Sequence, residues 1–400
     1  MLDTRTLSGT ALGMALRKMR LVTLACVEDL TDAQWQVPQR PELNPIAWEL
    51  GHLAWFCEFW VLRGPHRVGD DGLVHAALPP RIAGPDALYD SARLAHADRW
   101  AAPLPTRAEV LAMLAAQLDA CADALPSIYD DDAALYFHRL ALLHEAMHIE
   151  ALTALRATLG YTPPHHPAWH HVVLPRYMPG GTVRVAGGTV RIGWPAGQRG
   201  FAFDNELRGH GVEIADIEID LAPLLAGQFL EFIEDGGYDD PACWPGPAGA
   251  WRRRSGRHHP ARWRGEGDEW EHRWFDHWLP VDDDQMLVNV SAWEAEAYCR
   301  WAGRRLPRAA EWEHAAASSP TFLWGRSVWE WTADDFQPYP GFVPGPYKDY
   351  SAPWFGSHRE LRGGSFSTHV RLHDVRYRNF FLPERTDVFA GFRTVALGPR

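Results

Sequence analysis

The segment HEAMHIEALTALRATLG, residues 144–160, belongs to the stretch that decides the first half of the fold. The helical pattern begins near Asp131 and ends at Gly160, a residue that commonly terminates a helix. Within it, His144 and His148 are four residues apart, so their side chains lie on one face, close enough to bind one ion. The segment therefore predicts a long helix that carries a pair of potential metal ligands.

The same residues match two motifs. HEAMH is an H-E-x-x-H sequence, which on a helix describes a zinc peptidase with Glu145 as general base. HEAMHIE also contains H-x-x-x-H-x-E, which can belong to another metal and another reaction. A pair of histidines on a polar helix face that binds no metal is a third interpretation, because chance produces H-E-x-x-H in about one chain in twenty at this histidine content.

Three further segments before residue 160 are helical by pattern. Apolar residues recur at three- and four-residue steps over 12–30, and NPIAWELGHLAWFCEFWVL (44–62) begins with a cap-like Asn and a Pro at the first helical position. Thr106 opens TRAEVLAMLAAQLDACADAL with a plausible capping arrangement. Together with the segment ending at Gly160, these predict a bundle of four helices.

His52 is a candidate third ligand. It lies in ELGHLAWFCEF among Leu, Trp and Phe side chains, where a histidine is most often a buried core residue. In a bundle, however, an inward-facing His opposite an H-x-x-x-H pair on another helix is how metal sites are built. Three neutral imidazoles would leave the other positions of an ion free for substrates, and a six-coordinate iron(II) could then hold two substrates and dioxygen together.

The second half of the chain has a different pattern of residues from the first. Residues 161–181, YTPPHHPAWHHVVLPRYMPGG, read as a linker, and a metal cluster formed by their histidines (His165, His166, His170 and His171) is a weak alternative. Beyond it, β-like stretches such as TVRVAGGTVRIG alternate with turns, and helices are expected in SAWEAEAYCRWAG and PRAAEWEHAAA. We therefore predict three segments: a helical bundle over 1–165, a linker over 166–180 and an α+β domain over 181–400.

Composition restricts the possible classes of function. The net charge of −12 argues against a general nucleic-acid binder, and the sequence lacks an uncharged stretch of membrane-spanning length. The five cysteines include no C-x-x-C pair, and the opening residues lack an apolar signal core, so a reducing cytoplasm is expected. One basic segment, WRRRSGRHHPARWR (251–264), is either a solvated loop or a clamp for a small anionic group.

At this point a family resemblance becomes visible. The N-terminal half resembles the DinB-type helical bundle, and the C-terminal half resembles the lectin-like α+β domain of formylglycine-generating enzymes. The second resemblance is carried in order by NVSAWEAEAYCRWAGRRLPRAAEWEHAA, VWEWTAD, LRGGSF and AGFRTV. Both halves together resemble the ergothioneine sulfoxide synthases, including their relatives the selenoneine synthases. This resemblance implies a non-heme iron(II) enzyme that uses O2 and joins sulfur or selenium to C2 of the imidazole of hercynine, a trimethylated betaine.

The resemblance also implies a set of site residues. The iron ligands would be His52, His144 and His148, with Glu150 orienting an imidazole from behind. A tyrosine would donate a proton to an oxygen intermediate; Tyr339 is the candidate, with Tyr347 and Tyr350 as rivals.

For the betaine, the segment RYRNFFLPER supplies the candidate contacts. A trimethylammonium group cannot donate hydrogen bonds and is therefore held by aromatic faces. The resemblance implies Asn379 at the carboxylate and Phe380 or Phe381 at the ammonium, with Tyr377 and Arg378 nearby. A buried aromatic strand without a ligand is the alternative for each ring.

Departures from the family pattern bear on the second substrate. Members that use γ-glutamylcysteine commonly carry R-N-W-D and H-E-Q-Q-H, whereas this chain has Arg378-Asn379-Phe380-Phe381, and Ala146 and Met147 replace both glutamines. An amide contact in the pocket is lost, and the Met147 thioether near the metal becomes a candidate substrate contact. A closely spaced arginine pair is also missing from ARLAHADRWAAPLP. These changes make γ-glutamylcysteine an unsuitable partner and favour a seleno-sugar, or alternatively cysteine as the thiol.

Three other functions remain as alternatives. A zinc peptidase would need Glu145 as base and a further ligand downstream, and would have no use for the second half of the chain. Formylglycine generation requires paired cysteines late in the domain, and no cysteine follows Cys299. A non-catalytic binding module would have no need for three placed histidines.

Overall fold

The computed structural model describes residues 4–126, 131–165, 180–265, 269–325 and 327–398. The predicted linker, residues 166–180, lies outside the described residues except for its last position, as do His166, His170 and His171. His165, which directly precedes the predicted linker, is described and is exposed to solvent.

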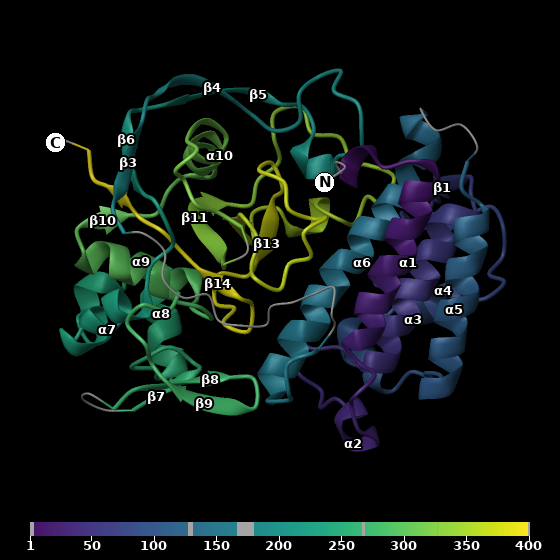
Figure 1. Cartoon of the computed structure of the whole chain (residues 1–400), viewed down its shortest axis with the longest axis horizontal. Coiled ribbons are helices and arrows are strands. Elements are labelled where there is room, and N and C mark those ends of the chain that lie inside the picture. The colour runs from purple at the N-terminus through teal and green to yellow at the C-terminus, as the bar shows by residue number, and fades with distance from the viewer. Residues whose placement is uncertain (1–3, 127–130, 166–179, 266–268, 326, 399–400) are drawn as a thin grey trace.

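The N-terminal half is a helical bundle, as the sequence predicts (Figure 1). Its long helices are α1 (Gly9–Ala25), α3 (Ile46–Cys57), α5 (Arg107–Asp123) and α6 (Asp132–Leu159). A π-helical turn, Glu58–Leu62, continues α3. Shorter elements fill the connections: α2 (Asp32–Trp35), α4 (Asp86–Tyr89), β1 (His66–Val68), β2 (Val74–Ala76) and the 3-10 turns Thr4–Thr6 and His96–Trp100.

Local signals set the helix ends. Thr106 caps α5 in a reciprocal capping box with Glu109, and Gly160 ends α6 in the left-handed conformation at φ 71°. The prediction differs from the structure at the start of α3. Pro45 is the N-cap there, and the Asn44 side chain instead donates a hydrogen bond to Glu49 at 2.8 Å. Pro45 has a ψ angle of 134°, which is extended rather than helical, so the helix begins one residue later, at Ile46.

The C-terminal half is an α+β domain. Two four-stranded sheets form its centre, in the orders β10-β15-β6-β3 and β13-β12-β11-β14. The first comprises β3 (Thr182–Val185), β6 (Ile217–Asp220), β10 (Arg304–Arg305) and β15 (Val395–Ala396). The second comprises β11 (Trp329–Asp335), β12 (Arg359–Arg362), β13 (Asn379–Phe381) and β14 (Ala390–Gly391).

Hairpins and helices surround these sheets. The smaller sheets are β4 (Gly188–Ile192) with β5 (His210–Ile214), and β7 (Trp263–Arg264), β8 (Glu271–Trp274) and β9 (His277–Pro280). The helices are α7 (Ala226–Glu234), α8 (Gly246–Ser255), α9 (Ala292–Trp301) and α10 (Ala309–Ser318), with 3-10 turns at Asp204–Glu206, Pro241–Cys243 and Ala352–Trp354. The predicted helices correspond to α9 and α10; α7 and α8 were not predicted.

The two halves meet along α6. In Figure 1 this helix stands at the edge of the bundle that faces β13 and the yellow C-terminal segments. A buried ion pair joins the halves at the N-terminus, where Arg5 donates to both oxygens of Glu206 at 2.6 Å. One hydrophobic cluster also contains residues of both halves, including Leu155 of α6 and Leu372. The helix that carries HEAMHIE is therefore placed between the two halves.

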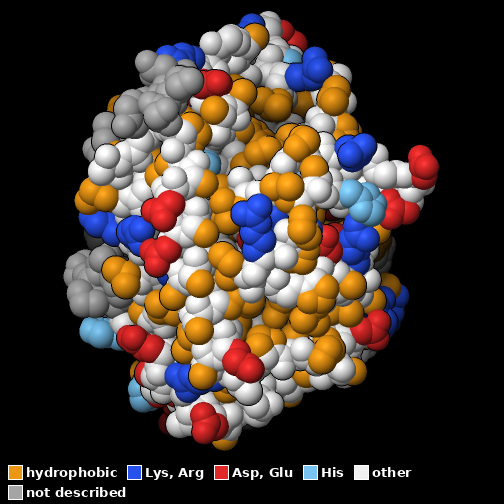
Figure 2. Space-filling model, turned by 90° about the vertical axis from the view of Figure 1, so that its right-hand side faces the viewer, with side chains coloured by type: hydrophobic (Ala, Val, Ile, Leu, Met, Phe, Trp, Pro, Cys, Tyr) orange, Lys and Arg blue, Asp and Glu red, His pale blue; other side chains and the backbone are white. Residues whose placement is uncertain are grey.

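The outer face of the bundle is shown in Figure 2. Charged side chains of both signs are scattered among hydrophobic ones on this face. Within the part of the chain that the structure describes, no helix combines the length and apolar character needed to cross a membrane.

Candidate functional site

Three histidines from two helices converge beside this boundary. His52 projects from α3, and His144 and His148 project from successive turns of α6. The Nε2 atom of His144 lies 3.3 Å from that of His52 and 3.2 Å from that of His148. One nitrogen from each ring lies within 4.8 Å of the other two, so these residues could hold one metal ion.

The outer ring nitrogens have fixed partners. His52 Nδ1 lies 2.8 Å from the carbonyl oxygen of Tyr89, and His148 Nδ1 lies 2.6 Å from Oε1 of Glu49. Both partners accept hydrogen bonds, so Nδ1 carries the proton in each ring and Nε2 keeps a lone pair. Lone pairs that converge at such distances repel one another unless a cation lies between them. The donor set therefore fits a divalent metal.

Burial keeps two of these imidazoles neutral. It lowers the pKa of His52 to about 3, and His148 adds to this effect. Burial likewise holds the pKa of His144 well below its usual range, where the ring is stacked on Phe56 with centroids 3.5 Å apart. Burial alone would raise the pKa of Glu49, but the adjacent His148 brings it below its ordinary value. Neutral imidazoles whose outer ring nitrogens have acceptor partners are suited to metal binding.

Glu145 does not face this group. Its carboxylate accepts hydrogen bonds from Arg20 Nε at 2.7 Å and from Thr23 Oγ1 at 2.7 Å, both on α1. The side chain is buried in the bundle, because it follows His144 directly and so leaves the helix about 100° around the axis. The peptidase interpretation of HEAMH therefore lacks its general base.

A cavity of about 270 Å³ opens next to His148, between α6 and the second sheet. Its walls include four residues proposed from the sequence to bind substrate, namely Met147, Asn379, Phe380 and Phe381. Aromatic and acidic or basic side chains complete much of the lining: Trp329, Tyr350, Tyr377, Phe389, Glu42, Glu150, Arg385 and Asp387. The structure thus brings these four residues to the histidine group, while their role in binding stays a prediction.

Glu150 takes a different position from the one expected. Its carboxylate accepts hydrogen bonds from Trp329 Nε1 and Ser365 Oγ at 2.7 Å and from Thr368 Oγ1 at 2.9 Å. The expectation that it orients an imidazole is wrong, because residues two apart in a helix face different directions. Burial raises the pKa of Glu150, and the hydroxyl and indole donors oppose that rise. Glu150 therefore joins α6 to the C-terminal half.

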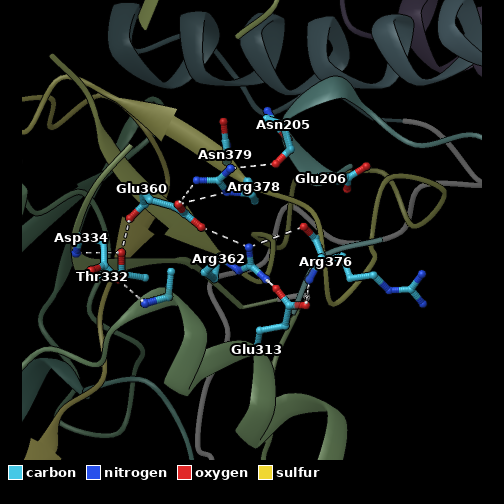
Figure 3. A network of polar contacts seen from close by, with 12 residues as sticks. Asn205, Glu206, Glu313, Thr332, Asp334, Glu360, Arg362, Arg376, Arg378 and Asn379 are labelled. Carbon is cyan, nitrogen blue, oxygen red and sulfur yellow. Dashed lines mark hydrogen bonds and ion pairs between the residues drawn. The ribbon is translucent and has the colours of Figure 1, made fainter. Parts of the chain in front are cut away.

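Arg378 also requires a correction, because it does not line the cavity. Figure 3 shows its guanidinium directed at Glu360 and at the backbone of Asn205. Nε and Nη2 donate to Glu360 at 3.1 and 2.7 Å, and Nη1 donates to the Asn205 carbonyl at 2.7 Å. Nη2 also donates to the carbonyl of Gln337. All the nitrogens of the Arg378 guanidinium are thus engaged within the protein, and Arg378 holds the start of β13.

Tyr339 lies with Arg378, away from the histidines. Its ring stands 4.0 Å from the Arg378 guanidinium and 4.7 Å from the His210 ring, measured to the ring centroid. Its expected position as the proton donor is therefore not supported by the geometry. The rival Tyr347 contacts His144 edge-on, with centroids 6.3 Å apart, and Tyr350 lines the cavity.

A pair of phenols stands at the wall of the cavity. The Tyr350 hydroxyl donates to the Tyr377 oxygen at 3.2 Å, which leaves the Tyr377 proton available to another acceptor. Burial raises the pKa of both phenols, so both are protonated at neutral pH. Sequence reasoning included Tyr377 only as an aromatic face.

Four other residues around the site were not predicted. Glu49 precedes His52 by three residues on the same helix, and that spacing was an available signal, whereas the Tyr89 carbonyl could not be anticipated from side-chain type. The Arg385–Asp387 ion pair, with two contacts of 2.5 Å, was also missed on the far wall of the cavity.

Comparison with known proteins agrees with this architecture. The DinB superfamily matches residues 15–154, and the family described as sulfatase-modifying factor enzyme 1-like domain matches residues 173–328 and 325–397. The hercynine oxygenase of Mycolicibacterium smegmatis is 32% identical over 434 aligned positions, covering 95% of this chain and 96% of the relative.

Two further relatives define the extent of the similarity. The hercynine oxygenase of Mycobacterium tuberculosis is 32% identical over 423 positions, covering 94% of this chain and 96% of the relative. The formylglycine-generating enzyme of Streptomyces coelicolor is 25% identical over 289 positions, covering 53% of this chain and 88% of that enzyme. By its domain composition and by its similarity over nearly the whole length, this chain belongs to the family of the hercynine oxygenases.

Proposed function

We propose that the protein is a non-heme iron(II) enzyme that uses O2 to form a C–Se or C–S bond at the imidazole C2 of hercynine. The observation that carries this proposal is the convergence of three imidazoles, one of which lines a cavity with aromatic walls. The relatives named hercynine oxygenases support the betaine as substrate.

In this proposal, His52, His144 and His148 hold the iron. Three nitrogen ligands leave half of an octahedral sphere for substrates, a pattern that suits iron(II) oxygenases. When bound, iron would supply the activation of dioxygen and the oxidising power. The protein residues fix the ring tautomers: Glu49 and the Tyr89 carbonyl each hold one Nδ1 proton, which directs Nε2 at the ion.

The cavity walls offer matching contacts for a betaine. The faces of Tyr377, Phe380 and Phe381 can hold a trimethylammonium group, which needs aromatic electron density rather than acceptors. The Asn379 Oδ1 accepts a hydrogen bond from the Phe380 backbone at 2.9 Å, so its Nδ2 donors are the part of the amide available to a carboxylate.

For the proton donor, we propose Tyr377 in place of Tyr339. Its hydroxyl accepts a hydrogen bond from Tyr350, so its own proton is free to move to a ligand in the cavity. Tyr350 would then stabilise the phenolate that remains.

For the second substrate, we propose a seleno-sugar, with cysteine as the alternative. Of the two positions that depart from H-E-Q-Q-H, Met147 lines the cavity, whereas Ala146 is fully buried in the bundle core. The loss of an amide at 147 therefore bears directly on recognition, and a polarisable thioether stands there instead. We further propose that the bundle, residues 1–165, holds the metal and that residues 181–400 cover it.

The test is a product assay with protein purified without oxygen and loaded with iron(II). Hercynine and O2 are supplied with a 1-seleno-sugar, cysteine or γ-glutamylcysteine in turn, and products are identified by mass. We expect a selenium adduct with the seleno-sugar, whereas a sulfur adduct formed only with cysteine would select the alternative. His52→Ala should abolish iron binding and product, and His165→Ala, at an exposed histidine, is the matched control. No adduct with any donor would refute the proposal.

A further inference from the structure

A second cavity, of about 250 Å³, lies at the C-terminal end of α6. Three arginines line it: Arg40, Arg262 of the basic segment 251–264, and Arg273 of β8. The other polar residues of its wall are Glu42, Thr158, Thr386 and Asp387. It shares Glu42 and Asp387 with the cavity beside the histidines, so the two are neighbours.

Arg262 has donor capacity that the described protein does not use. Its Nη2 donates to Thr158 Oγ1 at 3.0 Å and to the carbonyl of Asp387 at 3.3 Å. Its Nη1 is buried and has no hydrogen-bond partner among the described residues. Burial lowers the pKa of this guanidinium to about 10, and the nearby Arg273 adds to the effect while Asp387 opposes it. A buried guanidinium donor without an acceptor is costly, and a bound oxyanion would satisfy it.

Arg273 brings a second positive charge to the same place. Its Nη2 occupies the space over Gly160, lying 1.8 Å from where a Cβ at that position would stand. Gly160 therefore makes room for the guanidinium, in addition to ending α6. The negative end of the helix offsets part of the positive charge that the two arginines bring together. The nearby carboxylate of Asp387 is engaged by Arg385 in two 2.5 Å contacts.

Arginines that line another groove of the molecule have carboxylate partners, unlike Arg262 and Arg273 in the part of the chain that the structure describes. Another arginine-rich groove runs along α9 and β10, and its arginines are neutralised by carboxylates. The pairs are Arg300–Glu296, Arg304–Asp220 and Arg305–Glu311. Neither Arg262 nor Arg273 forms such an ion pair within the described ranges. The absence of a carboxylate partner for Arg262 and Arg273 among the described residues therefore distinguishes this cavity from that groove.

We infer that this cavity binds a small oxyanion of the phosphate class, through Arg262 and Arg273. Thr158 follows His148 by ten residues, or about 15 Å along the helix. The anion is either free phosphate or a phosphate monoester.

The test is calorimetric titration of the full chain with inorganic phosphate and, separately, with glucose 6-phosphate. Arg262→Met and Arg273→Met should each weaken phosphate binding roughly 10- to 100-fold, the effect of a lost charge-assisted hydrogen bond. Arg253→Met removes the same charge from an exposed position of α8 and should leave binding unchanged. Arg273→Lys keeps the positive charge but loses the paired N–H donors of the guanidinium, so it should weaken phosphate binding by an intermediate factor. Because lysine keeps the charge, this variant separates a loss of binding from misfolding of the methionine variants.

The two probes distinguish the sources of the anion. Tighter binding of the monoester would assign the cavity to a phosphorylated metabolite, and equal or weaker binding would assign it to free phosphate. If the wild-type chain binds neither probe, or if Arg253→Met weakens binding as much as Arg262→Met, the inference is wrong. Product formation from hercynine does not enter these readouts, so a failure here is separate from a failure of the proposed function.

Discussion

Replacing Glu49 by glutamine tests whether this carboxylate prepares the metal site. The side chain is 3% exposed and accepts the His148 Nδ1 proton at 2.6 Å. Glutamine keeps the shape and an acceptor oxygen but removes the negative charge. A charge-assisted hydrogen bond contributes about 1.5–3 kcal/mol against about 1 kcal/mol for a neutral one, so the loss is about 0.5–2 kcal/mol. That corresponds to iron(II) binding that is roughly 2- to 30-fold weaker.

The assay is an anaerobic competition titration of iron(II) against a coloured chelator. Glu150→Gln is the matched control, because it makes the same chemical change in a buried carboxylate on the cavity wall that faces Ser365 and Thr368 instead of an imidazole. We expect the control to bind iron within about twofold of the wild type, since it touches no ligand. Equal losses in both variants, or no loss in Glu49→Gln, would refute the assignment of Glu49 as the residue that orients His148.

Three further outcomes follow from the contacts described. Tyr377→Phe should lower turnover about 100-fold or more with little change in the KM for hercynine, as measured by steady-state kinetics, while Tyr339→Phe should retain most turnover. Arg378→Met should destabilise the fold by about 3 kcal/mol in urea unfolding, because it removes a partner of the buried Glu360, and adding Glu360→Gln should recover part of the loss. Burial lowers the pKa of His272 to about 4, so between that value and 6.5 the unfolded chain binds a proton that the folded chain does not. Stability should therefore fall as the pH drops from 6.5 towards 4, by up to about 1.4 kcal/mol per unit, and His272→Gln should reduce this slope in urea midpoints at pH 7 and pH 5.

The bundle and its histidines could be predicted because the information is local. Helical periodicity, the Thr106 capping box and the stop at Gly160 all lie within one turn of the residues that they govern. The four-residue spacing of His144 and His148 fixes their common face for the same reason. His52 needed the further assumption that α3 packs against α6 with this side chain inward, which the family resemblance supplied.

The surroundings of the site could not be predicted in the same way. Whether Arg378 or Asn379 reaches the cavity depends on how the chain enters β13, because Arg378 turns towards Glu360 just before the strand begins. The strand register that decides it pairs Leu361 with Asn379, residues brought together by tertiary structure alone. Tyr339 and Tyr377 likewise differ in where their loops cross the sheet, which no spacing in the sequence records.

The contacts of Glu150 have a consequence for the protein as a whole. Two of the three imidazoles lie on α6, and Glu150 of the same helix accepts hydrogen bonds from hydroxyl groups of the C-terminal half. A change in how the halves dock would therefore be transmitted to the geometry around the ion. Each half thus contributes side chains to the boundary beside the histidines, and neither could be exchanged for a homologous domain without new contacts at Glu150.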